Sequence, residues 1–286
     1  MDVTDKWQSM TTSEYAALEI ALGARLVATR NMWWRRVRPC FYRPLVPYCE
    51  LSPGEVRPPL ASLLGGVQHI VPAGVPANSH INLLLFDTPQ AYSLESLRAG
   101  SRYHIRRAMR SFSVRPIVRL DEFISQGYAV YLSFYERTHY SYKKERTDRR
   151  HFAEWACTIF RFPKVRIYGA YHGEELASVS ISYLVEEVLY TATFFSKSEA
   201  LDEYVSDLML HAIRERAAAS ENVRMIFAAH AGMERGLDEF YLRRGAKLVS
   251  KPARVTMNPL ALKFLKTFRK DRYGKLGIET HEGYHE

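Results

Sequence analysis

The sequence has few cysteines and no long apolar run, and each absence excludes a class of protein. Only Cys40, Cys49 and Cys157 occur among the 286 residues. Three thiols cannot all pair, and Cys40 and Cys49 lack the spacing of zinc ligands, so neither a disulfide framework nor a zinc site is expected. No apolar run approaches the roughly 18 residues of a membrane-spanning helix. The acidic start, Met-Asp-Val-Thr-Asp-Lys, has no signal-peptide core, and we expect a cytoplasmic protein.

What is present indicates a globular and basic protein. Hydrophobic residues make up 47% of the chain and aromatic residues 13%, enough for a substantial core. The net charge is +9, and residues 1–119 carry most of it, with 15 Lys/Arg against 8 Asp/Glu. Nearly all of these cations are arginines, which suit phosphate and planar bidentate contacts. An anionic partner such as a nucleic acid, a nucleotide or an anionic lipid would explain this bias, and so would a genome that favours arginine on surfaces.

Residues 94–112 combine a basic stripe with an apolar stripe on one predicted helix. The basic stripe consists of Arg98, Arg102, Arg106 and Arg110, spaced every four residues, with Arg107 beside them. The opposite stripe consists of Leu94, Leu97, Ser101, Ile105, Ala108 and Phe112. Like charges at this spacing repel by about 0.2–0.5 kcal/mol per pair. Either carboxylates elsewhere in the fold or a bound phosphate-bearing ligand should compensate for them.

A second stretch, residues 32–47, alternates aromatic residues with four arginines and has no clear period. Such a pattern can stack on bases and bind phosphates. It equally fits a loop laid over a core, with guanidinium groups reaching to solvent. We expect the loop.

The remaining pattern predicts a regular order of elements. Strands are expected at 67–71, 81–86, 114–119, 165–171, 176–185, 188–195, 225–229 and 247–257, and helices at 12–22, 122–140 with a break near 126–127, 150–160, 202–219, 234–244 and 260–268. The strands from 165 to 195 form an antiparallel meander. His281 and His285 lie four residues apart in the predicted tail, and an isolated pair there gives no ground for a metal site.

The segment from Met225 to Gly245 is the most informative part of this predicted order of elements. It reads as a strand, a loop at His230–Gly232, a helix with Phe240 and Tyr241 on one face, and a glycine. The sequence Phe-Tyr-x-x-x-Gly in this setting resembles the closing segment of the GNAT acyltransferase superfamily. The same spacing also fits the core-facing side of an ordinary amphipathic helix.

The order of elements from Val114 onward also resembles the GNAT fold, and three motifs resemble its Fem-type branch. These motifs are Ser-Arg-Tyr-His-Ile-Arg-Arg-Ala-Met-Arg at 101–110, the turn at 169–177 followed by Ser-Val-Ser, and Gly-Leu-Asp-Glu-Phe-Tyr-Leu-Arg-Arg-Gly at 236–245. The resemblance implies an α/β fold with a mixed, mostly antiparallel sheet flanked by helices. Fem-type proteins often carry two GNAT-like halves, and residues 1–93, short and strand-poor, would form a partial, degenerate one. Residues 94–258 would form the acyltransferase domain, and 259–286 a basic helix and tail.

The resemblance implies transfer of an acyl or aminoacyl group to an amine. Ordinary GNAT enzymes bind the pyrophosphate of CoA on a glycine-rich loop that opens the central helix. The equivalent segment here, residues 196–207, has no glycine and carries Glu199, Asp202 and Glu203. We therefore expect no tightly bound cofactor. Aminoacyl-tRNA, acyl-CoA and acyl-carrier protein remain open as the acyl donor, and a non-catalytic module that binds RNA or another anion is the alternative.

The resemblance also implies roles for individual residues. The reaction would occur where the strands at 188–195 and 225–229 separate, with a backbone N–H near Thr193, Phe194 and Phe195 stabilising the oxyanion. Tyr241 would protonate the leaving group or act as a positioning residue, and His230 would act as base or proton shuttle. Further candidates are Glu136 and His139 on the acceptor side and the arginines at 98, 102, 106, 107 and 110 on the donor side. His230, Glu136 and His139 fit surface or loop positions equally well.

Overall fold

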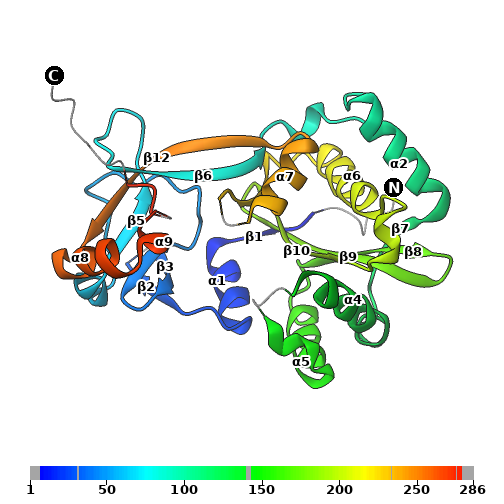
Figure 1. The fold of residues 1–286 in the computed structure, drawn as a ribbon, viewed down its shortest axis with the longest axis horizontal. Helices are drawn as coiled ribbons and strands as arrows, with labels where there is room; N and C mark the ends of the chain where they lie inside the picture. The colour runs from blue at the N-terminus through cyan, green and yellow to red at the C-terminus, as the bar shows by residue number, and fades with distance from the viewer. Residues whose placement is uncertain (1–6, 31, 140–142, 233, 275, 279–286) are drawn as a thin grey trace. The chain divides into compact units, whose positions relative to one another are not determined.

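The computed structural model describes residues 7–278 except 31, 140–142, 233 and 275 (Figure 1). The chain divides into two compact units. The first comprises residues 1–18, 84–229 and 239–247, and the second comprises residues 19–83, 230–238 and 248–286. Each unit is therefore assembled from segments that are far apart in the sequence.

The first unit is built on a sheet whose strands run in the order β11-β10-β9-β8-β7. These strands are β7 (Ser113–Pro116), β8 (Arg166–His172), β9 (Glu175–Val185), β10 (Val188–Ser196) and β11 (Met225–His230). The pairs β7–β8, β8–β9 and β9–β10 are antiparallel, whereas β10 and β11 are parallel. The short β1 (Ser9–Met10) pairs in parallel with β9. The predicted meander and the element order from Val114 are thus confirmed.

Helices cover both faces of this sheet (Figure 1). They are α2 (Ala99–Ser111) and α6 (Val205–Ala218) on one face, and α4 (Tyr128–Thr138) and α5 (Arg149–Phe160) on the other. α6 packs on β8 and β9 with an almost wholly buried middle, and α4 and α5 enclose an aromatic core with the sheet. In that core the rings of Phe123, Phe152, Trp155 and Phe195 lie within 6.4 Å of a neighbouring ring. Burial of these rings helps to hold the helices to the sheet.

The break predicted near residues 126–127 is a change of helical pitch. The chain runs from α3 (Leu120–Glu122) through a π-helical segment (Phe123–Gly127) directly into α4. A Cβ atom on Gly127 would lie 2.9 Å from the ring of Phe123. Glycine at this position therefore lets the wider turn pack against the aromatic core.

The second unit contains strands in the order β2-β3-β4-β5-β12. They are β2 (Leu26–Thr29), β3 (Met32–Arg38), β4 (Phe41–Pro44), β5 (Gly66–Ile70) and β12 (Lys247–Met257), and β6 (Ser79–Phe86) contributes residues to both units. Two helices near its C-terminal end, α8 (Pro259–Phe268) and α9 (Lys270–Gly274), pack through Leu265 and Tyr273 against Phe41 and Val255. α1 (Thr12–Ala21) and α7 (Arg235–Arg243) also contribute residues to both units.

The expectation of a loop at residues 32–47 is wrong, because this segment forms the antiparallel strands β3 and β4. Trp34 and Tyr42 are buried with Leu51 and Val67 on one face. Phe41 is buried on the other. Aromatic residues and arginines therefore occur on both faces, which hides the period of two that would have indicated a strand. Residues 1–93 are accordingly not strand-poor, since β1 to β6 all begin there.

No helix in the part of the chain that the structure describes has the length and apolar character needed to cross a bilayer. The predicted pair His281 and His285 lies outside the described residues.

Candidate functional site

The strands β10 and β11 pair over three residues and then separate. Their parallel register runs from Val188 opposite Met225 to Tyr190 opposite Phe227. β10 continues to Ser196, and its register with β9 shifts between Thr191 and Thr193. The separation expected from the GNAT resemblance is therefore present, with Thr191 as the first residue of β10 beyond the paired segment.

The hydroxyl of Tyr241 lies at this point of separation. It is 3.4 Å from Oγ1 of Thr191, which in turn lies 3.4 Å from the carbonyl oxygen of Phe227 on β11. Tyr241 is only 5% exposed, and its ring packs edge-on against Phe240, with centroids 5.1 Å apart. Burial raises the pKa of Tyr241, and the contact with Thr191 and the charge of Arg244 oppose this only in part. The phenol is therefore protonated at neutral pH and can donate a proton or a hydrogen bond.

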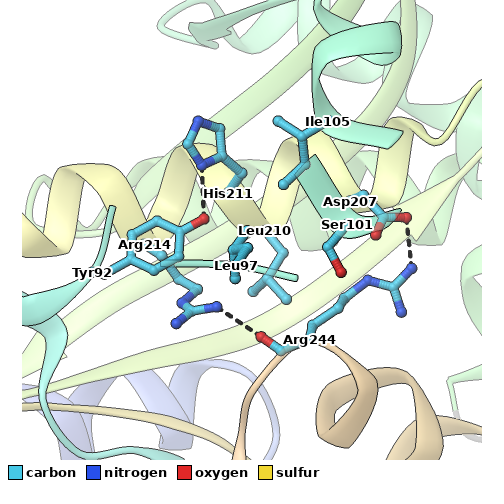
Figure 2. A pocket seen from close by; sticks show the side chains of 9 residues that line it. All are labelled: Tyr92, Leu97, Ser101, Ile105, Asp207, Leu210, His211, Arg214 and Arg244. Carbon is cyan, nitrogen blue, oxygen red and sulfur yellow. Dashed lines mark hydrogen bonds and ion pairs between the residues drawn. The ribbon is translucent and has the colours of Figure 1, made fainter. Parts of the chain in front are cut away.

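Arg244, just beyond α7, fixes the helix that carries Tyr241. Its guanidinium donates to Oδ2 of Asp207 at 2.7 Å and to the carbonyl oxygen of Phe240 at 2.9 Å, and it stacks on the Phe240 ring at 3.8 Å. The carbonyl oxygen of Arg244 accepts a hydrogen bond from Arg214 at 2.7 Å, as Figure 2 shows. These contacts tie the end of α7 to the first turn and the middle of α6.

A small pocket borders this network (Figure 2). It is lined by Tyr92, Leu97, Ser101, Ile105, Asp207, Leu210, His211, Arg214 and Arg244. The Tyr92 hydroxyl lies 2.7 Å from Nδ1 of His211, and the Arg214 guanidinium stacks on the rings of Phe86 and Tyr92. Burial lowers the pKa of Arg214 to about 10 and raises that of Tyr92 to about 12. The pocket encloses about 240 Å³ even when open space at its mouth is included, which is less than a typical ligand site requires. We assign it to packing between α2 and α6.

The predicted arginine stripe on α2 divides into two groups. Arg102 donates to the carbonyl oxygens of Leu97 and Glu95, and Arg106 lies 3.9 Å from the carboxylate of Glu95. These two arginines therefore interact with the turn before α2. The guanidinium of Arg107 lies 5.5 Å from the centre of the Tyr204 ring, and Arg98, Arg107 and Arg110 are exposed. Arg106 is exposed as well, so the stripe presents four arginines to solvent, and only Arg102 is half-buried.

The start of α6 differs from a glycine-lined phosphate loop. Its N-cap residue, Tyr204, has a left-handed backbone with φ of 61°, and its ring stacks on His104 with centroids 3.9 Å apart. Asp207, in the first turn, is paired with Arg244. The preceding Lys197 forms an ion pair with Glu175. Side chains of α2 and α6 thus cover the region where a pyrophosphate would otherwise meet backbone N–H groups.

The other candidates in the first unit occupy varied environments. Thr193 and Phe194 are half-buried on β10, and the rings of Phe194 and Phe240 lie 6.0 Å apart. Phe195 is buried in the aromatic core. Glu136 and His139 are exposed at the end of α4, where His139 has φ of 48° and caps the helix. Their proposed roles stay predictions.

His230, the last residue of β11, belongs to the second unit. Burial, together with the charges of Arg43 and Arg35, lowers its pKa to about 4. The imidazole is therefore neutral at pH 7 and is a weak base. A histidine that titrates near pH 6.5 is a suitable proton shuttle at neutral pH, and His230 in this environment does not meet that condition.

Several residues around the site were not singled out from the sequence. Thr191 is one of several threonines in strands, and no motif marks it. The pair Asp207–Arg244 joins residues 37 positions apart. Without an alignment of related sequences, nothing in the pattern connects them.

Comparison with known proteins gives structural but not sequence matches. No family model matches the chain, and no curated protein matches it by sequence. Among solved structures, L-PGS from Bacillus licheniformis is similar with a TM-score of 0.58 at 11% identity, covering 98% of this chain and 100% of that one. The C-terminal DUF2156 domain of a putative lysylphosphatidylglycerol synthetase from Agrobacterium fabrum has a TM-score of 0.57 at 10% identity, covering 92% and 94%. FemX has a TM-score of 0.55 at 11% identity, covering 90% and 93%. The chain therefore has the GNAT-like fold of the Fem type.

Proposed function

We propose that the protein is an acyltransferase that moves an acyl or aminoacyl group to an amine. The observation that carries this proposal is the protonated, buried hydroxyl of Tyr241 at the point where β10 and β11 separate. The similarity in fold to FemX and to L-PGS supports it. The name lysylphosphatidylglycerol synthetase describes a protein that makes an aminoacylated lipid, and this favours an aminoacyl group as the one transferred.

The chemistry requires three things of the site. The attacking amine must be neutral, the oxyanion that forms on the carbonyl must be stabilised, and the leaving group must gain a proton. Backbone N–H groups of β10 beyond Tyr190, in the region Thr193–Phe195, are free of pairing with β11 in the described register and supply the oxyanion donor. Tyr241 supplies the proton. The neutral amine would come from solution or from a base outside the residues assigned here.

We place an aminoacyl-tRNA first among the donors. The start of α6 is covered by the stacked rings of Tyr204 and His104, and the segment before it carries acidic residues that repel a pyrophosphate. Arg98, Arg107 and Arg110 present positive charge on the exposed side of α2. Acyl-CoA and acyl-carrier protein are the competing donors. The same exposed arginines also suit a non-catalytic module that binds RNA.

The experiment measures binding of three labelled donors, namely charged tRNA, acyl-CoA and acyl-carrier protein, to nucleic-acid-free protein over a salt series. Tight tRNA binding with a steep dependence on salt supports the aminoacyl-transferase assignment. Binding of acyl-CoA with a shallow dependence would overturn the choice of donor and return the protein to ordinary acyltransferases. A single-turnover transfer assay with the donor that binds then separates an enzyme from a binding module, because only the enzyme releases the free carrier.

A further inference from the structure

The second unit contains a cluster of positive groups that has no role in the function proposed above, which uses Tyr241 and the arginines of α2. Arg35 on β3 and Arg43 on β4 are direct cross-strand partners. Both guanidinium groups also lie near enough to His230, at the end of β11, to lower its pKa. The strand register therefore places two guanidinium groups side by side, and the charges of both act on the neutral imidazole of His230.

Like charges directly opposite each other in a sheet are destabilising, so this arrangement requires compensation. Arg35 has it, because its guanidinium forms an ion pair with Glu19. Arg43 does not. Its guanidinium donates to the neutral amide oxygen of Gln68, and no carboxylate among the described residues pairs with it. Its Nε atom is buried without a hydrogen-bond acceptor.

The surroundings of Arg43 hold it in a fixed orientation. The Gln68 amide nitrogen donates to Oγ of Ser79 at 2.9 Å and to the carbonyl oxygen of Leu276 at 2.8 Å. These two bonds fix which end of the Gln68 amide is its oxygen, and that oxygen accepts from Arg43. A buried guanidinium that is oriented by a network but neutralised by no carboxylate is costly to the fold, and a ligand that brings negative charge removes the cost.

We propose that Arg35, Arg43 and His230 form a binding site for a phosphate group of a co-substrate. The proposal deepens the proposed function and rests on it only in assigning the phosphate to a substrate of the transfer. A carboxylate has two oxygens and is satisfied by one guanidinium fork. A tetrahedral phosphate has enough oxygens to accept from two neighbouring guanidinium groups and an imidazole at once, and the cross-strand pair Arg35–Arg43 supplies the two guanidinium groups. The neutral imidazole adds a further donor without adding charge.

The test uses the full chain with ¹³C-labelled histidine and follows the imidazole signal of His230 by NMR, assigned with a His230→Gln variant. Inorganic phosphate is titrated at constant ionic strength, and acetate is titrated in parallel. Phosphate should produce a saturable change in this signal and raise the pKa of His230 by about 1 pH unit, because the anion offsets the two guanidinium charges. Acetate should bind at least about tenfold more weakly.

The variant Arg43→Gln should raise the phosphate dissociation constant by about tenfold or more, the loss expected for a charge-assisted hydrogen bond. The matched control is Arg38→Gln, which removes the same charge from an exposed position on β3 and should leave binding unchanged. Should Arg43→Gln fail to fold, Arg43→Lys keeps the charge and removes the planar fork, and it should weaken phosphate binding severalfold.

Absence of a saturable response in the wild-type protein, or an equal response in the Arg43 and Arg38 variants, would overturn the site. Stronger binding of acetate would overturn the choice of phosphate. This readout needs no acyl transfer. If the protein binds phosphate at this site and the Tyr241→Phe variant keeps full turnover, the phosphate site stands and the proposed mechanism fails. If the protein does not bind phosphate and Tyr241→Phe loses turnover, the mechanism stands and the phosphate site fails.

Discussion

Asp207 in the first turn of α6 and Arg244 just beyond α7 form an ion pair with 2.7 Å between Oδ2 and the guanidinium nitrogen. Both side chains are largely buried, at 9% and 21% exposure. Arg244 follows Tyr241 by three residues, so the pair sets the position of the helix that carries the proposed acid. Positions of catalytic groups must hold to within about 0.5 Å for efficient transfer.

The variant Arg244→Met should therefore lower kcat more than it changes KM, although Arg244 touches no substrate in the proposed mechanism. Loss of one partner leaves Asp207 buried without its cation, and the free energy of unfolding should fall by about 2–4 kcal/mol. Steady-state kinetics and urea unfolding measure the two effects. The exposed Arg243→Met is the control, and it should change both by little because its pair with Glu239 lies in solvent. Wild-type kcat in a folded Arg244→Met protein would refute the positioning role.

Removal of the Tyr241 hydroxyl should lower kcat by about 100-fold and leave KM nearly unchanged, as for loss of a general acid. The variant is Tyr241→Phe, and the exposed Tyr103→Phe on α2 is its control. Because burial raises the pKa of Tyr241, the wild-type enzyme should keep its phenol protonated, and this group should cause no loss of activity below about pH 10. A Tyr241→Phe enzyme with unchanged turnover would remove the residue from the mechanism.

The sequence predicted the first unit well because its signals are local. The meander from β8 to β10 follows apolar alternation and short turns, and α2 follows a four-residue repeat. The hairpin of β3 and β4 was missed because Trp34 and Phe41 are buried on opposite faces, each among arginines. A strand with both faces partly covered loses the period of two on which its recognition depends.

Residues of the candidate site could be predicted from the sequence only where they belong to a recognisable motif or position. Tyr241 was found through the sequence Phe-Tyr-x-x-x-Gly, and its neighbour Thr191 was not, since a threonine in a strand has no distinguishing pattern. His230 was found by its position at a strand end. Its low pKa comes first from burial and then from the charges of Arg43 and Arg35, which are nearly two hundred residues away in the chain. Electrostatic environments made by distant segments leave no local signal in one sequence.

Charge reversal on α2 should separate the two groups of arginines. The double variant Arg107→Glu/Arg110→Glu changes exposed side chains and should weaken binding of the anionic donor by more than tenfold, with a shallower dependence on salt. Arg102→Glu/Arg106→Glu should also lose donor binding and stay folded. It should be the less stable of the two, because it places new carboxylates beside Glu95 and the carbonyl oxygen of Leu97. Filter binding over a salt series and thermal unfolding measure these effects. Unchanged donor binding in both variants would exclude α2 from the donor interface.

The glycine of the π-helical segment offers a test of packing that is independent of catalysis. Gly127→Ala places a methyl group 2.9 Å from the Phe123 ring, which must shift within a packed aromatic core. The free energy of unfolding should fall by about 1–3 kcal/mol. Gly100→Ala in the first turn of α2 meets nothing within 4 Å and should be neutral or stabilising by up to about 1 kcal/mol. Equal effects of the two substitutions in urea unfolding would contradict the close packing at Gly127.

Acid should destabilise the first unit through His211. Burial lowers the pKa of this imidazole, whose Nδ1 lies 2.7 Å from the Tyr92 hydroxyl, so the folded protein holds it neutral. The unfolded chain gains a proton near pH 6.5, and the folded chain does so only at lower pH. The contribution of the neutral His211 to the free energy of unfolding is therefore present above pH 6.5. It is lost as the pH falls from that value through the pKa of His211 in the folded protein. Urea unfolding between pH 4 and 8 should show this slope. His211→Gln keeps a polar group at the position and should reduce this dependence of the unfolding free energy on pH. The control is His151→Gln at an exposed position, which should leave the dependence as in the wild type. Identical slopes in the two variants would show that another group is responsible.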